Sequence, residues 1–122
     1  MDIRIKATNF EMTEDTRGYL DERLDSLEKL LGDDAALTRC EVELGRDAGR
    51  PRHGANMWFA EIRILSPGGI PVNARNNAPS VNAAIDDVKE EVERQLGREK
   101  KLHIRVLRKT GAAIKNWMKF GH

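Results

Sequence analysis

Cysteine and histidine are scarce in this 122-residue chain, and their scarcity excludes two classes of protein. Cys40 is the single cysteine, so no internal disulfide can form, as is usual for proteins of a reducing compartment. The three histidines, His53, His103 and His122, are not spaced as metal ligands. We therefore expect no disulfide-stabilised scaffold and no metal site, and we interpret Cys40 as a small core residue.

Long apolar runs are also missing. No stretch approaches the roughly 18 apolar residues that a membrane-spanning helix needs, and residues 1–6 alternate apolar with charged side chains, unlike the core of a secretory signal. The length suits one small domain with a core of its own. We therefore expect a cytoplasmic protein without a membrane partner.

Recognisable catalytic patterns are absent from the sequence. No glycine-rich phosphate loop joins a predicted strand to a helix, and no serine or cysteine nucleophile has an evident base. The carboxylates occur on the outer faces of predicted helices, at spacings typical of solvation and ion pairing. The sequence therefore indicates a binding module and not an enzyme, with no cofactor and no small-molecule substrate.

Apolar periodicity predicts the secondary structure. Alternating apolar side chains predict strands over residues 2–8, 38–44, 55–65 and 70–75. Three- and four-residue apolar spacing predicts one helix over 13–31, capped by Thr13 and ended by Gly32, and a second over 79–96, with Pro79 in its first turn and Gly97 as its stop. Residues 112–120 have the pattern of a further short helix.

The strand pattern predicts the architecture. Each strand is apolar on one face only, so both helices must cover that face and leave the other open. The first helix permits a parallel crossover between strands one and two, whereas hairpins make the remaining strands antiparallel. The prediction is an α+β two-layer sandwich, β-α-β-β-β-α, formed by residues 1–103, followed by a basic tail over 104–122 that we expect to be mobile.

The open face of this predicted sheet is poor in aromatic side chains. Only Phe59 is expected to point outward, and a sheet that reads single-stranded bases needs several exposed rings. The cations on this face either contact phosphates or pair across strands with neighbouring glutamates, and the sequence leaves both readings open. They are Arg4, Lys6, Arg63 and Arg75. The loop over 45–54 adds three arginines that are also able to reach a phosphate backbone.

The net charge of +1 conceals two oppositely charged segments. Residues 98–122 hold eight Lys and Arg and one acidic residue, a net charge of +7, whereas residues 1–97 hold 13 basic and 19 acidic residues, a net charge of −6. A basic segment after an acidic body indicates a polyanionic partner, of which nucleic acid is the usual one, or a solubilising tail.

Two stretches of the sequence resemble one known family. Residues 4–14 (RIKATNFEMTE), followed by an acidic helix, resemble the opening of the ribosome hibernation promoting factor and ribosome-associated translation inhibitor family. Residues 82–86 (NAAID), followed by Arg94-Gln95-Leu96 and a basic cluster, resemble its second helix. The similarity extends from residue 2 to about residue 103, without the additional C-terminal domain of long members, so the chain is similar to the short forms.

The resemblance implies a fold akin to double-stranded RNA-binding domains and a specific role. That role is to bind the small ribosomal subunit and its ribosomal RNA where messenger and transfer RNA sit, and to inhibit translation and protect idle ribosomes under stress. We expect a monomer off the ribosome. The family positions that contact RNA match Arg94, Arg98, Lys100 and Lys101, with Lys29 and Lys89 as further matches; the basic segment adds Arg105, Arg108 and Lys109.

The second predicted helix departs from the family pattern in charge. Glu91 occupies a position that is often basic in the family, and four further carboxylates make the first half of this helix acidic. We therefore expect the RNA contact to lie toward the C-terminal end of the helix and the tail. Two alternatives share the same sequence features: a module for another structured RNA, and a non-catalytic protein-interaction adaptor.

Overall fold

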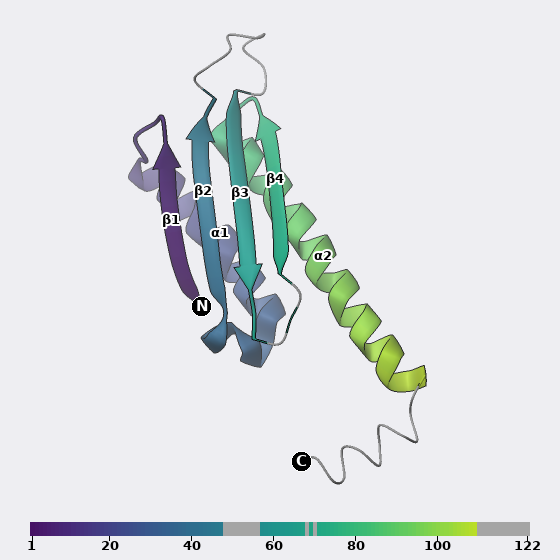
Figure 1. Ribbon diagram of the computed structural model, residues 1–122. Helices are drawn as coiled ribbons and strands as arrows, with labels where there is room; N and C mark the ends of the chain where they lie inside the picture. The colour runs from purple at the N-terminus through teal and green to yellow at the C-terminus, as the bar shows by residue number, and fades with distance from the viewer. Residues whose placement is uncertain (48–56, 68, 70, 110–122) are drawn as a thin grey trace.

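One four-stranded sheet with both helices on one face forms the molecule (Figure 1). The computed structural model describes residues 1–47, 57–67, 69 and 71–109, with the backbone alone over 99–109. Its elements are β1 (Asp2–Thr8), α1 (Glu14–Leu31), a 3-10 helix η1 (Gly32–Leu37), β2 (Arg39–Arg46), β3 (Trp58–Leu65), β4 (Val72–Ala78) and α2 (Val81–Lys109). The predicted β-α-β-β-β-α order is confirmed.

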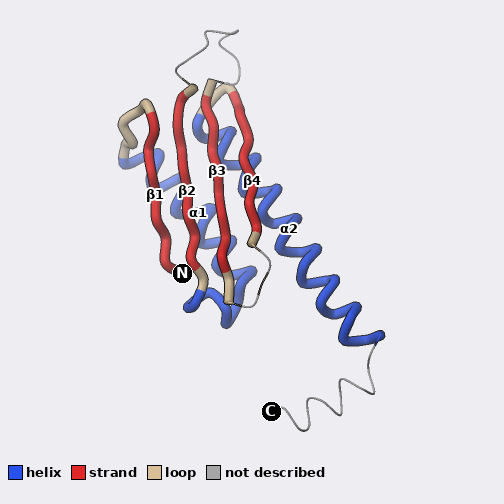
Figure 2. The backbone as a smooth tube through the Cα atoms, in the orientation of Figure 1, coloured by secondary structure: helices blue, strands red, loops and turns tan. Residues whose placement is uncertain are grey.

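The strands lie in the sheet in their order along the chain, β1-β2-β3-β4 (Figure 2). β1 is parallel to β2, and the two remaining pairs are antiparallel. This confirms the predicted crossover and hairpins. β4 is an edge strand and begins directly after Pro71, which cannot donate to a ladder.

The core lies between the sheet and the two helices. Helix α1 contributes Leu20, Leu24 and Leu27, which recur at helical spacing and are 0–1% exposed. Over the part of α2 whose side chains are described, the fully buried residues are Ala84, Ile85, Val88 and Val92, and those of the sheet include Leu44, Ile62 and Ile64. Each such Leu, Ile or Val stabilises the fold by roughly 1.5–3 kcal/mol relative to an exposed position. The apolar periods read from the sequence therefore correspond to the packed faces.

The helix boundaries follow local capping interactions. The Thr13 hydroxyl accepts a hydrogen bond from the Thr16 amide at 3.2 Å, and Gly32 ends α1 with a φ of 58°, as predicted. The Ser80 hydroxyl accepts from the Ala83 amide at 3.1 Å, so α2 begins at Val81 and Pro79 lies outside it. The predicted placement of Pro79 in the first turn is therefore wrong.

Helix α2 continues past its predicted end. Gly97 lies inside the helix, which runs to Lys109, so the prediction of Gly97 as a stop is wrong and the expected boundary between residues 103 and 104 falls within α2. A helical glycine costs about 1 kcal/mol relative to alanine. The residues after it are mostly strong helix formers, and Leu96 packs against the core, so the helix tolerates this cost. Residues 112–120 lie outside the described residues.

Strand β4 also differs from the prediction. It begins at Val72 and includes Asn76 and Asn77, which were expected to lead into the helix. These two residues pair with Ala60 and Phe59 of β3, so the backbone ladder outweighs the low strand propensity of asparagine. The 3-10 helix η1 was not predicted from the sequence. No helix among the described residues is long and apolar enough to cross a bilayer.

The buried thiol of Cys40 gives a testable consequence of this packing. Cys40 is 0% exposed, and burial raises the pKa of its thiol to about 12. Since the thiolate is the reactive form, we expect native protein at pH 8 to be alkylated by iodoacetamide only at the rate at which the domain opens. Mass spectrometry of the modified chain over time, with and without denaturant, measures this rate. Rapid modification of the native protein would contradict the burial of Cys40.

Candidate nucleic-acid interface

Helix α2 changes charge along its length. Residues 86–93 hold five acidic residues and one basic residue, whereas residues 94–109 hold seven basic residues and one acidic residue. We call residues 94–109 the basic half of α2. The last side chain of the helix known to pack against the core is Leu96, and in Figure 1 the helix projects beyond the lower end of the sheet. Thirteen residues after Leu96 extend the helix by roughly 20 Å at 1.5 Å per residue.

The basic half begins with an arginine pair around one carboxylate. Arg94 donates from Nε and Nη2 to Glu91 Oε2 at 3.0 and 2.6 Å, and the Arg98 Nη2 atom lies 3.7 Å from Glu91 Oε1. Gln95 donates to Glu91 Oε1 at 3.1 Å. Hydrogen bonds from Arg94 and then Gln95 lower the pKa of Glu91, and the bond to Glu91 raises the pKa of Arg94. Glu91 thus orients both arginines toward one side of the helix.

Both arginines of this pair remain accessible. Their side chains are 62% and 73% exposed, for Arg94 and Arg98 respectively. An exposed ion pair is weak, so a phosphate group is able to compete with Glu91 for either guanidinium. The five remaining predicted contacts of the basic half follow on the same helix, whose backbone alone is described there: Lys100, Lys101, Arg105, Arg108 and Lys109.

The two other predicted site residues lie among carboxylates. Lys89 pairs with Glu93 at 2.6 Å and lies with Glu22, Asp86 and Glu90 in the groove between the helices. Lys29, in the last turn of α1, lies beside a shallow hollow that Asp25 and Glu28 also line. The structure therefore brings Arg94 and Arg98 together but does not join Lys29 or Lys89 to them.

A contact that the sequence did not indicate ties the two helices together. The Tyr19 hydroxyl donates to Asp86 Oδ2 at 2.6 Å, and Arg23 Nε donates to Asp86 Oδ1 at 3.1 Å. The Arg23 guanidinium also lies 3.6 Å from the centroid of the Tyr19 ring. Tyr19 and Arg23 each lie 63 or more positions from Asp86 in the chain, so no local sequence pattern reveals their contact with it. It fixes the lateral position of α2 and hence the direction of its basic half.

The Tyr19 contact predicts a pH dependence of stability. Its hydrogen bond to Asp86 raises the pKa of Tyr19 above 10.0, so the bond contributes stability below that pH and loses it as pH rises through the folded-state pKa. We expect Tyr19→Phe to lower the melting temperature at pH 7, because the bond is gone. The difference between the two proteins should shrink above pH 10. Thermal denaturation followed by circular dichroism measures both effects; a difference that does not change with pH would contradict this role.

The open face of the sheet carries charges of both signs in register. Across the strands, Arg4, Glu41 and Arg63 form one row, and Lys6, Glu43, Glu61 and Arg75 form the next. Glu41 lies 3.1 Å from Arg39 and 3.9 Å from Arg63, so part of this charge is paired within the face, as the cross-strand interpretation predicts. This mixed face is a poorer attractor of polyanions than the basic half of α2.

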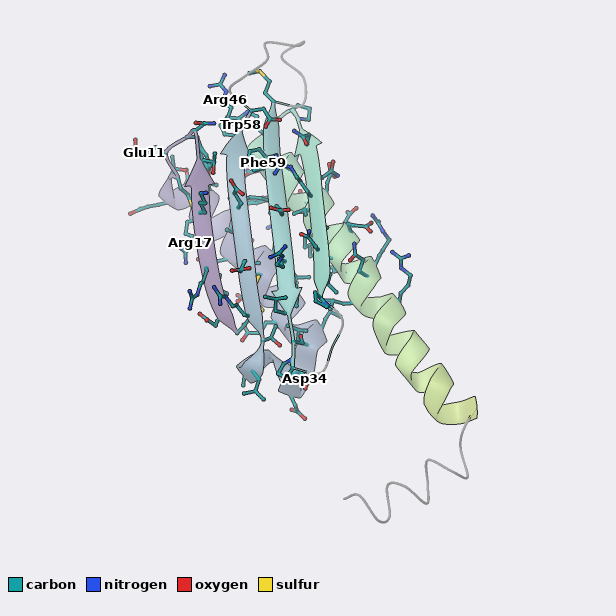
Figure 3. The ribbon with its side chains drawn as sticks, in the orientation of Figure 1. Glu11, Arg17, Asp34, Arg46, Trp58 and Phe59 are labelled. Atoms are coloured by element: carbon teal, nitrogen blue, oxygen red, sulfur yellow. The ribbon has the colours of Figure 1, made fainter. Side chains whose placement is uncertain are left out.

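Phe59 lies on the open face, as predicted, but it is not exposed (Figure 3). Only 4% of the residue is accessible. Its ring lies over Gly45 of β2, and the Arg75 guanidinium lies 4.0 Å from the ring centroid. The described part of the open face therefore offers no ring on which a base can stack.

The loop end of the sheet holds a third contact between an arginine and an aromatic ring. Arg46 lies 5.6 Å from the Trp58 ring centroid, and Trp58 makes an edge contact with Phe10 at 5.4 Å (Figure 3). The arginines of the following loop, Arg50 and Arg52, lie outside the described residues. Among the residues that are described, no group of three potential metal ligands gathers.

The fold and the charged helix define the class of protein: a small two-layer α+β domain whose last helix extends from the sheet as a basic segment. Residues 3–103 match the model of the family described as Sigma 54 modulation protein / S30EA ribosomal protein, and the chain belongs to this family. It is the family that the two sequence motifs indicated. No curated protein sequence matches this chain.

Two solved structures are similar to this one. The N-terminal domain of Protein Y from Thermus thermophilus aligns with a TM-score of 0.63 and 26% identity, over 80% of this chain and 98% of that one. A ribosomal subunit interface protein from Coxiella burnetii aligns with a TM-score of 0.64 over 83% of this chain and 99% of that one; at 13% identity it supports the fold alone.

Proposed function

We propose that this protein is a cytoplasmic, non-catalytic factor that binds the small ribosomal subunit through its ribosomal RNA. In this proposal it occupies the region where messenger and transfer RNA sit, and so inhibits translation and stabilises idle ribosomes under stress. The family match over residues 3–103 supports this function. Off the ribosome we expect a monomer.

The charge separation along α2 is the observation that supports the choice of RNA-binding surface. Residues 94–109 combine seven basic side chains with a helix that extends past the sheet, whereas α1 and the first half of α2 are acidic. Phosphate contacts supply most of the affinity of such a surface and little sequence preference. We infer that the RNA lies along the basic half of α2 and avoids the acidic groove between the helices.

Co-sedimentation with purified small subunits across a salt series tests the proposal. We expect saturable, near-stoichiometric binding at moderate salt that is absent with an equal mass of unrelated structured RNA. If about six phosphates are contacted, affinity should fall by roughly a thousandfold between 50 and 200 mM salt. Equal, unsaturable binding to both RNAs would reduce the function to general RNA binding. Binding that is insensitive to salt would instead favour a protein-interaction adaptor.

A truncation tests where the contact lies. Removal of residues 104–122 deletes Arg105, Arg108 and Lys109 together with the tail, and should weaken binding to the subunit and lower its salt dependence. Full binding by the truncated protein, with its helical content confirmed by circular dichroism, would contradict a contact at the C-terminal end of α2.

A further inference from the structure

Two large apolar side chains of the described residues are exposed, and both lie where α1 runs into η1. Leu37 is 73% exposed and Leu30 is 49% exposed. Leu37 ends η1 and Leu30 lies in the last turn of α1. Neither belongs to the core cluster or is among the partly buried residues packed against it. Burying such a side chain on a partner is worth roughly 1.5–3 kcal/mol.

Acidic residues lie close to these leucines in the sequence. Asp33 and Asp34 lie in the first turn of η1, between the two leucines in sequence, and both are exposed. Asp25 and Glu28 of α1 line a separate shallow hollow with Lys29, Gly32 and Ala35; neither leucine lines it. An apolar patch with an acidic rim fits a segment that is itself apolar and basic.

The chain contains such a segment after α2. Residues 110–122 lie outside the described residues; in sequence they hold Ile114, Trp117, Met118 and Phe120, with Lys115 and Lys119 and no acidic residue. Their composition complements the patch in both polarity and charge.

The end of α2 lies within reach of this patch. Both helices run toward the same end of the sheet, where η1 also lies (Figure 1). The eight residues from Lys109 to Trp117 span up to roughly 26 Å when extended, and the eleven to Phe120 up to roughly 36 Å, at 3.3 Å per residue. Both spans exceed the roughly 20 Å by which α2 extends beyond Leu96. The tail is therefore long enough to return from Lys109 to the domain that it follows.

We propose that the C-terminal segment, residues 110–122, docks on its own domain at the Leu30 and Leu37 patch, with Trp117 and Phe120 against the leucines and Lys115 and Lys119 beside the carboxylates of η1 and α1. The inference does not depend on ribosome binding. It assigns these tail residues a protein contact in the free molecule, in contrast to a stacking contact with RNA bases.

Amide chemical shifts of the full chain test this docking without the ribosome. Replacing Trp117→Ser and Phe120→Ser together should shift the amide signals of residues 30–37 and leave those of the exposed sheet residues Arg63 and Asn73 unchanged. The matched control, Asn116→Ala with His122→Ala, changes the same tail without its apolar residues and should leave residues 30–37 in place. Docking on the patch also predicts that Leu37→Ser moves the Trp117 side-chain signal, whereas Asn76→Ser does not.

Three results would overturn the proposal. Residues 30–37 could keep their signals in the Trp117 and Phe120 variant, or the shifts could map to the open face of the sheet. Shifts that vanish on dilution would instead assign the tail to a second copy of the chain. The first of these results would leave the tail residues available for contact with RNA, which the subunit-binding experiment measures separately.

Discussion

Reversing three charges in the basic half of α2, with Arg98→Glu, Lys101→Glu and Arg105→Glu combined, should weaken binding to the small ribosomal subunit by about a hundredfold or more at low salt. Each cation removed from a phosphate costs affinity, and each glutamate adds repulsion. The slope of log affinity against log salt should become shallower by about one for each phosphate that the variant no longer neutralises. Co-sedimentation or fluorescence anisotropy across a salt series measures both quantities.

A charge-matched control separates this site from net charge. Arg4→Glu, Arg17→Glu and Arg63→Glu together change the net charge equally, at exposed positions on β1, α1 and β3. If the basic half of α2 is the contact, this control should bind within a few-fold of the parent protein. Equal weakening in both triple variants, each verified as folded by circular dichroism, would contradict a localised interface and indicate only long-range attraction.

The largest stability effect of a minimal substitution is expected at Gly45. A Cβ atom there would lie 2.4 Å from two ring carbons of Phe59 and 2.9 Å from the Thr8 carbonyl oxygen. The ring cannot move away easily, because it is buried and the Arg75 guanidinium lies 4.0 Å from its centroid. We expect Gly45→Ala to lower the free energy of unfolding by about 2 kcal/mol, as overpacking typically does. The melting temperature should fall by roughly 5–10 °C.

Two companion variants make this prediction specific. Gly18 lies in α1 with nothing within 4 Å of an added Cβ, so Gly18→Ala should stabilise the protein by about 0.5–1 kcal/mol. Phe59→Leu removes the ring that meets the new methyl group, so the double variant Gly45→Ala with Phe59→Leu should lose less stability than the sum of its single changes. Urea denaturation measures all four proteins. Additive destabilisation would show that Phe59 is not the cause.

Local patterns were sufficient where one physical factor dominates. The period of two in β1 and the three- and four-residue spacing of Leu20, Leu24 and Leu27 predicted buried faces, because burial of apolar surface is the strongest term in folding. Thr13 and Gly32 marked the ends of α1 for equally local reasons. The prediction that Gly97 ends the second helix was wrong, because the helix formers that follow it and the packing of Leu96 outweigh the cost of one glycine.

The site residues also divide into those that a local sequence pattern predicts and those whose surroundings depend on the fold. The spacing of Glu91 with Arg94 is a local helical pair, visible in the sequence. Contacts between residues that are distant in the chain are not visible in the sequence. The strand pattern placed Phe59 on the open face, but its burial depends on Gly45 across the β2–β3 ladder and on Arg75 across the β3–β4 ladder. Tyr19 meets Asp86 only because the sheet places α1 beside α2. Lys29 and Lys89 matched family positions, yet both lie among carboxylates, which come mostly from their own helices.

The sequence by itself determined the order of elements, the faces that form the core, the family, and the separation of an acidic body from a basic C-terminal segment. These follow from periodicity, capping and charge, which depend on residues a few positions apart. Only the tertiary structure decided which side chains meet: Phe59 with Gly45 and Arg75, and Tyr19 with Asp86. It also decided that the basic half of α2 extends beyond the sheet. Such contacts join residues distant in the chain, and the geometry of the whole fold sets their distances.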